Sequence, residues 1–384
     1  MDTGPPCATG DHSGLPYDLE YSRFSARTMR VLRLLPFHPG PDVSAAAVAA
    51  LTDLPVGEAC NAVECLVKAR VVENVPGRED RWRIHPSAPS CAQRLPDDSR
   101  VQEREQARDR LLDYYLITAE AADRRVRGLP RLSASEEFVD RNEALTWLDS
   151  ERSCLFAAVR MAADTGRDEA AKRLPLLMAH YLGFRGLFDD LLAVTRTSLR
   201  SAQLLGDRIA ESEALTNLGL ASWGLRRYHD AVIAHRDAVA LFRECGDRQG
   251  EGDALNNLGI ALHGLGQDEE AASVYQNAAA IFRDTGDLFS EGKALNNLGI
   301  ALCVMQQFGE AVTAHQGAVA IFRETGHEYE EASALANLGN DFRKLGLSDQ
   351  AIAAYQEAAD IFRETGDYRN ELMALQSLGM NSQA

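Results

Sequence analysis

The sequence predicts an all-α protein built mainly as a right-handed α-solenoid of 40-residue units. The hexamer at residues 214–219 returns at 254–259, 294–299 and 334–339, and it fades at 374–379. A second marker, Leu241-Phe242-Arg243, keeps the same step along the chain. A fixed period of this size indicates stacked copies of one helix pair, each of which buries its apolar face on the next copy.

Shifts in composition divide the 384 residues into four expected parts. Residues 1–20 are rich in Gly, Pro and Asp without periodicity, which is typical of a disordered leader. We expect a small domain at 21–90, a helical connector at 91–170 and the solenoid at 171–384.

The small domain is expected to contain three helices and a β-hairpin. The helices are predicted over 21–35, 45–51 and 55–68, with Ser44 as a cap and Pro55 in the first turn of the third helix. Residues 71–75 and 81–84 read as strands on either side of a turn at 76–80. This combination predicts a winged helix.

The connector begins after a Pro/Ser-rich linker at 86–99. Apolar residues at helical spacing predict one long helix over 100–126, which the Gly128-Leu129-Pro130 sequence ends. Two further helices are expected at about 135–147 and 150–164.

The solenoid is expected to hold five helix pairs, of which the first, at 174–186 and 188–205, is degenerate, and a lone helix from Tyr368. Gly219 should let a neighbouring helix come close, and Gly246 should end the second helix in a left-handed cap. His235 and His315 alternate with Tyr275 and Tyr355 at one packing position, so we expect them in the core.

The pattern of Leu218-Gly219, Ala231, His235 and Ala238 resembles the tetratricopeptide repeat. The period of 40 exceeds the family's usual length of about 34 residues, and longer second helices account for the difference.

The upstream residues resemble the winged helix and helical connector of actinobacterial STAND (NB-ARC-type) regulators. The matching segments are Tyr21-Ser22 and residues 30–42, 110–115 and 144–151. The family's ATPase module is expected before residue 20, and no G-x-x-x-x-G-K-[ST] sequence occurs. The resemblance therefore implies the sensor-and-scaffold half of such a regulator, without useful affinity for ATP or GTP.

One asparagine occupies the same helix position in four successive units: Asn217, Asn257, Asn297 and Asn337. Asn is a mediocre residue inside a helix, so its return needs a reason. A side-chain amide offers one acceptor and two donors, and can grip the main chain of an extended peptide. Peptide-binding tetratricopeptide proteins use an Asn in this way, which the resemblance implies here. The alternative is an Asn that ties neighbouring helices together inside the stack.

Variable residues surround this asparagine column, as expected for a concave groove that chooses among peptide side chains. The partner-binding candidates are Asn217, Asn257, Asn297, Asn337, Asn256, Asn296, Asn340, Trp223, His263 and Arg343.

The charge favours neutral or basic partners. The chain carries a net −17, and residues 208–384 hold 13 basic and 26 acidic residues. This sign disfavours nucleic acid. No apolar run is long enough for a membrane span, and the seven scattered cysteines contain no C-x-x-C pair, which fits a cytoplasmic protein without a zinc site. The sequence leaves open whether the chain assembles into a homo-oligomer.

The sequence shows no spacing typical of a catalytic centre, a metal site or a cofactor site. We therefore expect a non-enzymatic, regulatory protein- or peptide-binding scaffold. One alternative is a DNA-binding regulator that uses Arg30, Arg33, Arg81 and Arg83 of the winged helix. The other is a small-molecule-binding, even biosynthetic, protein whose groove holds the ligand near Trp223.

Overall fold

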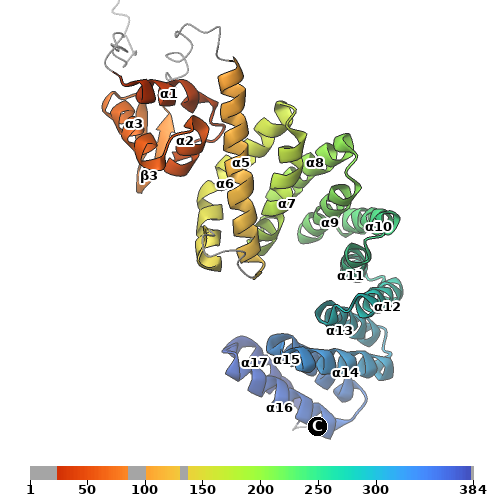
Figure 1. Cartoon of the computed structure of the whole chain (residues 1–384). Coiled ribbons are helices and arrows are strands. Elements are labelled where there is room, and N and C mark those ends of the chain that lie inside the picture. Colours follow the sequence, from red (N-terminus) through yellow and green to blue (C-terminus); the bar gives the residue numbers. More distant parts are fainter. Residues whose placement is uncertain (1–23, 85–100, 130–136, 382–384) are drawn as a thin grey trace, which may run out of the picture. The chain divides into compact units, whose positions relative to one another are not determined.

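The computed structural model describes residues 24–84, 101–129 and 137–381 (Figure 1). The expected leader at 1–20 and the linker at 86–99 lie outside these residues. The chain separates into two compact units, which divide the connector between them. The first unit ends at Tyr115 and also takes in Glu151–Ala158, whereas the second holds Leu116–Ser150 and everything from Val159 onward.

The first unit contains three helices and a three-stranded antiparallel sheet in the order β1-β3-β2. Its elements are α1 (Ala26–Leu34), a short 3-10 helix (Leu35–Phe37), β1 (Val43–Ser44), α2 (Ala45–Thr52), α3 (Val56–Lys68), β2 (Val72–Val75) and β3 (Arg78–Ile84). Ser44 caps α2, as predicted, by accepting a hydrogen bond from the Ala47 N–H. This arrangement is that of a winged helix.

The structure corrects three details of this domain. The first helix begins at Ala26, because Ser25 caps it. The hairpin turn is tighter than the predicted 76–80: Gly77 has a φ of +75°, which allows β3 to begin at Arg78. The strand β1 was not predicted, since two residues are too few to show a period; Val43 pairs with Trp82.

The connector consists of α5 (Val101–Val126) and α6 (Arg141–Asp164). The two helices predicted at 135–147 and 150–164 are therefore one. No Gly or Pro interrupts residues 141–164, and the Ser150 hydroxyl donates to the Trp147 carbonyl within the helix, at 2.9 Å. Ser150 is accordingly accommodated without a break.

The solenoid has five helix pairs and a closing helix among the described residues, as predicted. They are α7 (Asp168–Phe184) with α8 (Phe188–Leu205), α9 (Arg208–Gly224) with α10 (Tyr228–Cys245), α11 (Arg248–Gly264) with α12 (Asp268–Thr285), α13 (Leu288–Val304) with α14 (Phe308–Thr325), α15 (Glu328–Lys344) with α16 (Ser348–Glu364), and α17 (Tyr368–Asn381). The first pair begins earlier than predicted, with Pro175 inside α7. Gly246 and Gly286 end their helices in the left-handed conformation.

The first helices α9, α11, α13 and α15 each receive a ring from the second helix of the same pair. A Cβ atom at Gly219 would lie 2.4 Å from His235, and one at Gly259 would lie 2.5 Å from Tyr275. Both rings are buried, so the predicted core position is confirmed. Glycine is needed here because the ring occupies the place of a side chain.

Glutamates at one position of the first helices, buried in α11, α13 and α15, link successive pairs. Glu251 of α11 accepts hydrogen bonds from Arg243 of α10 at 2.9 Å and from Arg248 at 2.7 Å. The same contact recurs as Arg283–Glu291, Arg323–Glu331 and Arg363–Glu371. The arginines therefore hold the stack together. Sequence reasoning missed the glutamates, although they too return every 40 residues.

The described part of the chain contains no candidate for a membrane-spanning helix.

Candidate partner-binding surface

The predicted asparagines lie on one face of four first helices, α9, α11, α13 and α15. We call this surface the Asn face and define it by Asn217, Asn257, Asn297 and Asn337. All four side chains are partly exposed. Residues three positions later in each helix, from Leu220 to Asn340, are partly exposed as well. The face therefore presents a row of amides to solvent, flanked by residues that differ from one helix to the next.

Two of the four asparagines make hydrogen bonds between helix pairs. Asn297 donates to Asn256 at 3.1 Å, and Asn337 donates to Asn296 at 3.1 Å. In this half of the face the amides do tie neighbouring first helices together. Asn256 and Asn296, which we predicted as binding residues, act here as acceptors.

The other two asparagines are free to bind something else. Among the described residues, no side-chain hydrogen bond engages the amide of Asn217 or Asn257. In the two hydrogen-bonded cases the acceptor lies 41 residues before the donor. The residues at that separation from Asn217 and Asn257 are Leu176 and Thr216, and the Thr216 hydroxyl donates instead to the Ser212 carbonyl at 3.0 Å. The peptide-gripping hypothesis therefore applies most directly to α9 and α11.

Acidic side chains stand beside the free amides, one turn earlier in the same helices. Asp253 is exposed, yet the protein around it removes enough water to raise the pKa of its carboxyl group to about 6, and Asp287 adds repulsion. The pKa of Glu213 is raised for the same reason, with repulsion from Asp207 and Asp247. A cationic group placed beside these two carboxyl groups would lower both pKa values again.

The remaining predicted residues differ in how exposed they are and in whether they already make a hydrogen bond. Trp223 is 38% exposed on α9. His263 contacts Asp268 through its Nδ1 atom at 2.5 Å, so its ring is already engaged. Asn340 accepts a hydrogen bond from the Tyr355 hydroxyl at 2.9 Å, and Arg343 is exposed. These contacts leave Trp223 and Arg343 as the more accessible members of the set.

A buried hydrogen bond joins α14 to α15, which belong to successive helix pairs. His315 Nδ1 is 2.6 Å from Asp341 Oδ2, and both side chains are 1% exposed. The first helices α9, α11 and α13 carry Ala221, Ala261 and Ala301 at the position of Asp341. Sequence reasoning missed Asp341, although it is a visible exception in an alanine column.

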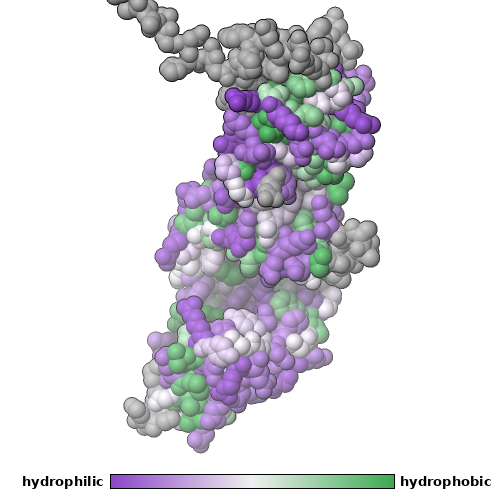
Figure 2. Space-filling view, turned by 90° about the vertical axis from the view of Figure 1, so that its left-hand side faces the viewer, coloured by the Kyte–Doolittle hydropathy of each residue, from purple (hydrophilic) through white to green (hydrophobic). Residues whose placement is uncertain are grey.

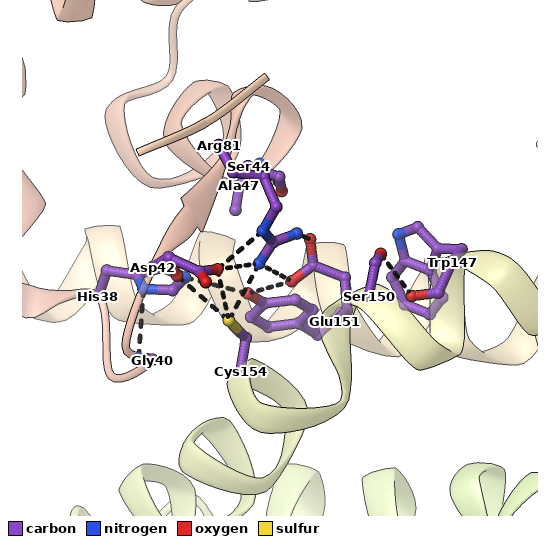
Figure 3. A network of polar contacts seen from close by, with 11 residues as sticks. His38, Gly40, Asp42, Ser44, Ala47, Arg81, Trp147, Ser150, Glu151 and Cys154 are labelled. Carbon is purple, nitrogen blue, oxygen red and sulfur yellow. Dashed lines mark hydrogen bonds and ion pairs between the residues drawn. The ribbon is translucent and has the colours of Figure 1, made fainter. Parts of the chain in front are cut away.

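The first unit contains a separate network of buried polar groups (Figure 3). Arg81 of β3 donates to Glu151 of α6 at 2.5 Å and to Asp42 at 2.7 Å. Glu151 also accepts from the Tyr115 hydroxyl at 3.4 Å. Cys154 donates to the Asp42 carbonyl at 3.2 Å. The network fixes the wing strand to the two long helices.

Burial keeps the other members of this network neutral. It lowers the pKa of His38 to about 4, and Glu151 opposes the shift only in part. His38 Nδ1 accepts a hydrogen bond from the Gly40 N–H at 3.2 Å, so Nε2 carries the proton toward the Tyr115 hydroxyl, 3.0 Å away. Burial also raises the pKa of the Cys154 thiol to about 12, which makes it an inert cysteine.

This network weakens the support for DNA binding. Arg81 was one of four bases on which that hypothesis rested, and it is buried in ion pairs with Asp42 and Glu151. Arg30 lies 3.5 Å from Glu103. The helix that would enter a groove, α3, exposes Glu64 beside Lys68. DNA binding nevertheless stays an untested hypothesis.

A cleft of about 600 Å³ lies between α3 and the β2–β3 hairpin. It is lined by Glu64, Val67, Lys68, Asn74, Val75, Pro76, Gly77, Arg78 and Trp82. This cleft is in the first unit and does not belong to the Asn face. Within the described residues, no three His, Cys, Asp or Glu side chains gather as metal ligands do.

The repeated helix pairs define the class of this part of the chain: the helices between residues 210 and 364 are tetratricopeptide repeats. The family model "Tetratricopeptide repeat" matches residues 210–284 and 290–364.

The chain is further similar to the tetratricopeptide part of a STAND-type regulator. It is 37% identical to "Regulatory protein AfsR" of Streptomyces coelicolor over 164 residues, which cover 39% of this chain and 16% of that protein. It is 35% identical to the protein of the same name in Streptomyces griseus over 217 residues, or 53% of this chain and 22% of that one. The chain thus spans less than a quarter of the length of these relatives.

Two solved structures share the fold. One is a Signal Transduction ATPase with Numerous Domains protein with a tetratricopeptide repeat sensor from Pyrococcus horikoshii, with a TM-score of 0.51 and 16% identity over 94% of this chain and 54% of that one. The other is the apo form of RapI, with a TM-score of 0.53 and 15% identity over 71% of each chain.

Proposed function

We propose that the chain is a non-enzymatic regulatory scaffold that holds an extended, basic segment of a partner protein against the Asn face. The observation that carries the proposal is the pair of free amides, Asn217 and Asn257, one turn from the acids Glu213 and Asp253. A free amide can donate to a peptide carbonyl and accept from a peptide N–H. Such contacts hold a main chain whatever its sequence.

The acids supply the preference for a basic side chain. A Lys or Arg beside Asp253 would form a charge-assisted contact and return the carboxyl pKa toward its ordinary value. Lys293, at the same position of α13, has the opposite charge. We therefore expect the basic residue of the partner to lie over α9 and α11, and not over α13. The similarity to proteins named as regulatory supports the regulatory part of the proposal.

A positional library of extended ten-residue peptides tests this function on the full chain. We expect peptides with a central Lys or Arg to bind at least about tenfold more tightly than those with Glu, a difference of about 1.4 kcal/mol. Asn217→Ala with Asn257→Ala should weaken all bound peptides alike, whereas Asp253→Asn should weaken only the basic ones. Asn277→Ala, on the exposed face of the second helix α12, is the matched control.

Two outcomes would contradict the proposal. One is the absence of saturable binding by any library member at about 1 mM, the weak limit of specific recognition. The other is binding that Asn277→Ala reduces as much as the double variant does.

A further inference from the structure

One position of the first helices changes its charge twice along the solenoid. This position lies one turn before the Asn face, and its residues in α7, α9, α11 and α13 are Arg173, Glu213, Asp253 and Lys293. We call these four residues the charge column. The acids and Lys293 are exposed, and Arg173 is partly exposed. Two acids therefore stand between two cations in a row that crosses four helices.

The two cations of the charge column remain accessible to an anion. Arg173 lies 3.2 Å from Glu120 of α5, and these two side chains are 43% and 51% exposed. An ion pair that exposed contributes at most about 1 kcal/mol, so an incoming carboxylate can compete for Arg173. Lys293 Nζ lies 5.5 Å from the centre of the Phe289 ring, which leaves its hydrogen-bond donors unused by that contact.

The first helices set the spacing of the charge column. Cα atoms of α9 come within 8 Å of those of α11, and α7 with α9 and α11 with α13 are neighbours in the same way. The axes of helices packed directly together lie about 8–10 Å apart. A segment that crosses these helices along the Asn face must therefore present one side chain to the charge column at each step of about this length.

This step distinguishes between the two extended conformations of a peptide. In a β-strand, side chains on the same side lie about 7 Å or about 13 Å apart. In a polyproline II helix every third side chain lies on the same side, about 9 Å apart. That helix has no internal hydrogen bonds, so its backbone groups are free to meet the amides of Asn217 and Asn257.

The surface of the solenoid favours recognition by charge and hydrogen bonds. On the side shown in Figure 2, hydrophilic side chains predominate over the solenoid and hydrophobic ones are scattered among them. We propose that the partner segment is a polyproline II helix with the pattern acidic-x-x-basic-x-x-basic-x-x-acidic, whose four charged side chains meet the charge column. Because the column has a cation at each end, the pattern is the same for either direction of the segment. The inference rests on the proposed function and adds the conformation and charge pattern of the bound segment.

Three ten-residue peptides of identical composition test the spacing. Each has Glu at both ends, Ser at the neutral positions and two central Lys residues placed two, three or four positions apart. Titrated into the full chain, the peptide with the three-position spacing should bind at least about tenfold more tightly than the others. Only this spacing lets both Lys side chains reach Glu213 and Asp253, and one charge-assisted hydrogen bond contributes about 1.5–3 kcal/mol. Asn217→Ala with Asn257→Ala should weaken all three.

The terminal residues of the best peptide test the flanking cations. Replacing either terminal Glu by Lys should weaken binding by about threefold to tenfold, because a like charge then meets Arg173 or Lys293. Lys293→Glu should abolish this loss for one end of the peptide and keep it for the other, which also reveals the direction of the segment. Ser333→Glu, at the same position of α15, is the matched control and should change neither.

The outcomes separate this inference from the function on which it rests. Equal affinities for the three spacings, with binding that still requires Asn217 and Asn257, would overturn the charge pattern and leave the proposed function standing. A Lys293→Glu chain in which neither end of the peptide regains affinity would overturn it as well. Failure of all three peptides to bind would count against the proposed function, and the inference would fall with it.

Discussion

Single glycines show most directly how this sequence specifies its packing. Gly259 and Gly379 occupy the same position of the repeat, but only Gly259 lies under a ring. Gly259→Ala should destabilise the chain by about 1–3 kcal/mol through overpacking against Tyr275. Gly379→Ala should be neutral or slightly stabilising, since Ala is the better helix former by about 1 kcal/mol. Equal shifts of the urea midpoint in the two variants would contradict this account.

The buried histidine His235 gives a test by pH. Burial lowers its pKa to about 4, below the ordinary 6.5. Between these values the unfolded chain binds more protons, so stability falls as the pH drops from 6.5 to 4, by about 3 kcal/mol at most. His235→Tyr copies the residue at position 275 and should flatten this part of the stability curve. The pKa of His38 is lowered in the natural chain and in the His235→Tyr variant alike, so the difference between their stability curves comes from His235. Superimposable pH curves would show that His235 is not buried as described.

For single residues, the sequence predicts well which ones share a position of the repeat, and poorly which hydrogen-bond partner each one has. The 40-residue period identifies Asn297 as one of a series, and it places His235 in the core. It does not show that Asn297 donates to Asn256, because that contact joins residues 41 positions apart and depends on how successive first helices are offset. The free and the engaged asparagines therefore look alike in the sequence.

At the scale of helices, the contact between α14 and α15 differs from those before it. His315 and Asp341 form a buried pair where other units use a ring and an alanine. Asp341→Ala should cost about 1–3 kcal/mol, because it leaves the buried Nδ1 atom of His315 without its hydrogen-bond partner. Adding His315→Tyr recreates the Tyr275 and Ala301 arrangement and should restore most of that stability. Thermal and urea unfolding of the two variants measure the effect, and a single variant that costs less than about 1 kcal/mol would contradict it.

Helix ends and lengths were predictable only where the sequence marks them. Gly246 and its equivalents fixed the ends of the second helices. The prediction divided the long α6 between residues 147 and 150, but no residue there breaks the helix, and the Ser150 hydroxyl is satisfied inside it. The strand β1 is held by pairing with β3, a contact between distant residues that no local pattern reveals.

For the whole molecule, charge and fold agree on a binding role. The net charge of −17 and the raised carboxyl pKa of Asp253 favour a basic partner segment. Such binding should release little or no proton at pH 8, where the carboxyl groups are already ionised. Near pH 6 the basic segment should displace a fraction of a proton from Asp253. Calorimetry in buffers of different ionisation enthalpy measures this release, and its absence with Asp253→Asn is the control.

The central claim is that Asn217 and Asn257 grip a main chain. It is tested most directly by methylating, one at a time, the backbone nitrogens of a peptide selected from the library. Methylation removes a donor without changing the side chain, so the account predicts strong losses of affinity at the two peptide bonds that face Asn217 and Asn257. These losses should disappear when the corresponding asparagine is replaced by alanine. A peptide that tolerates methylation at every backbone nitrogen, but loses binding when its side chains are changed, would contradict the claim.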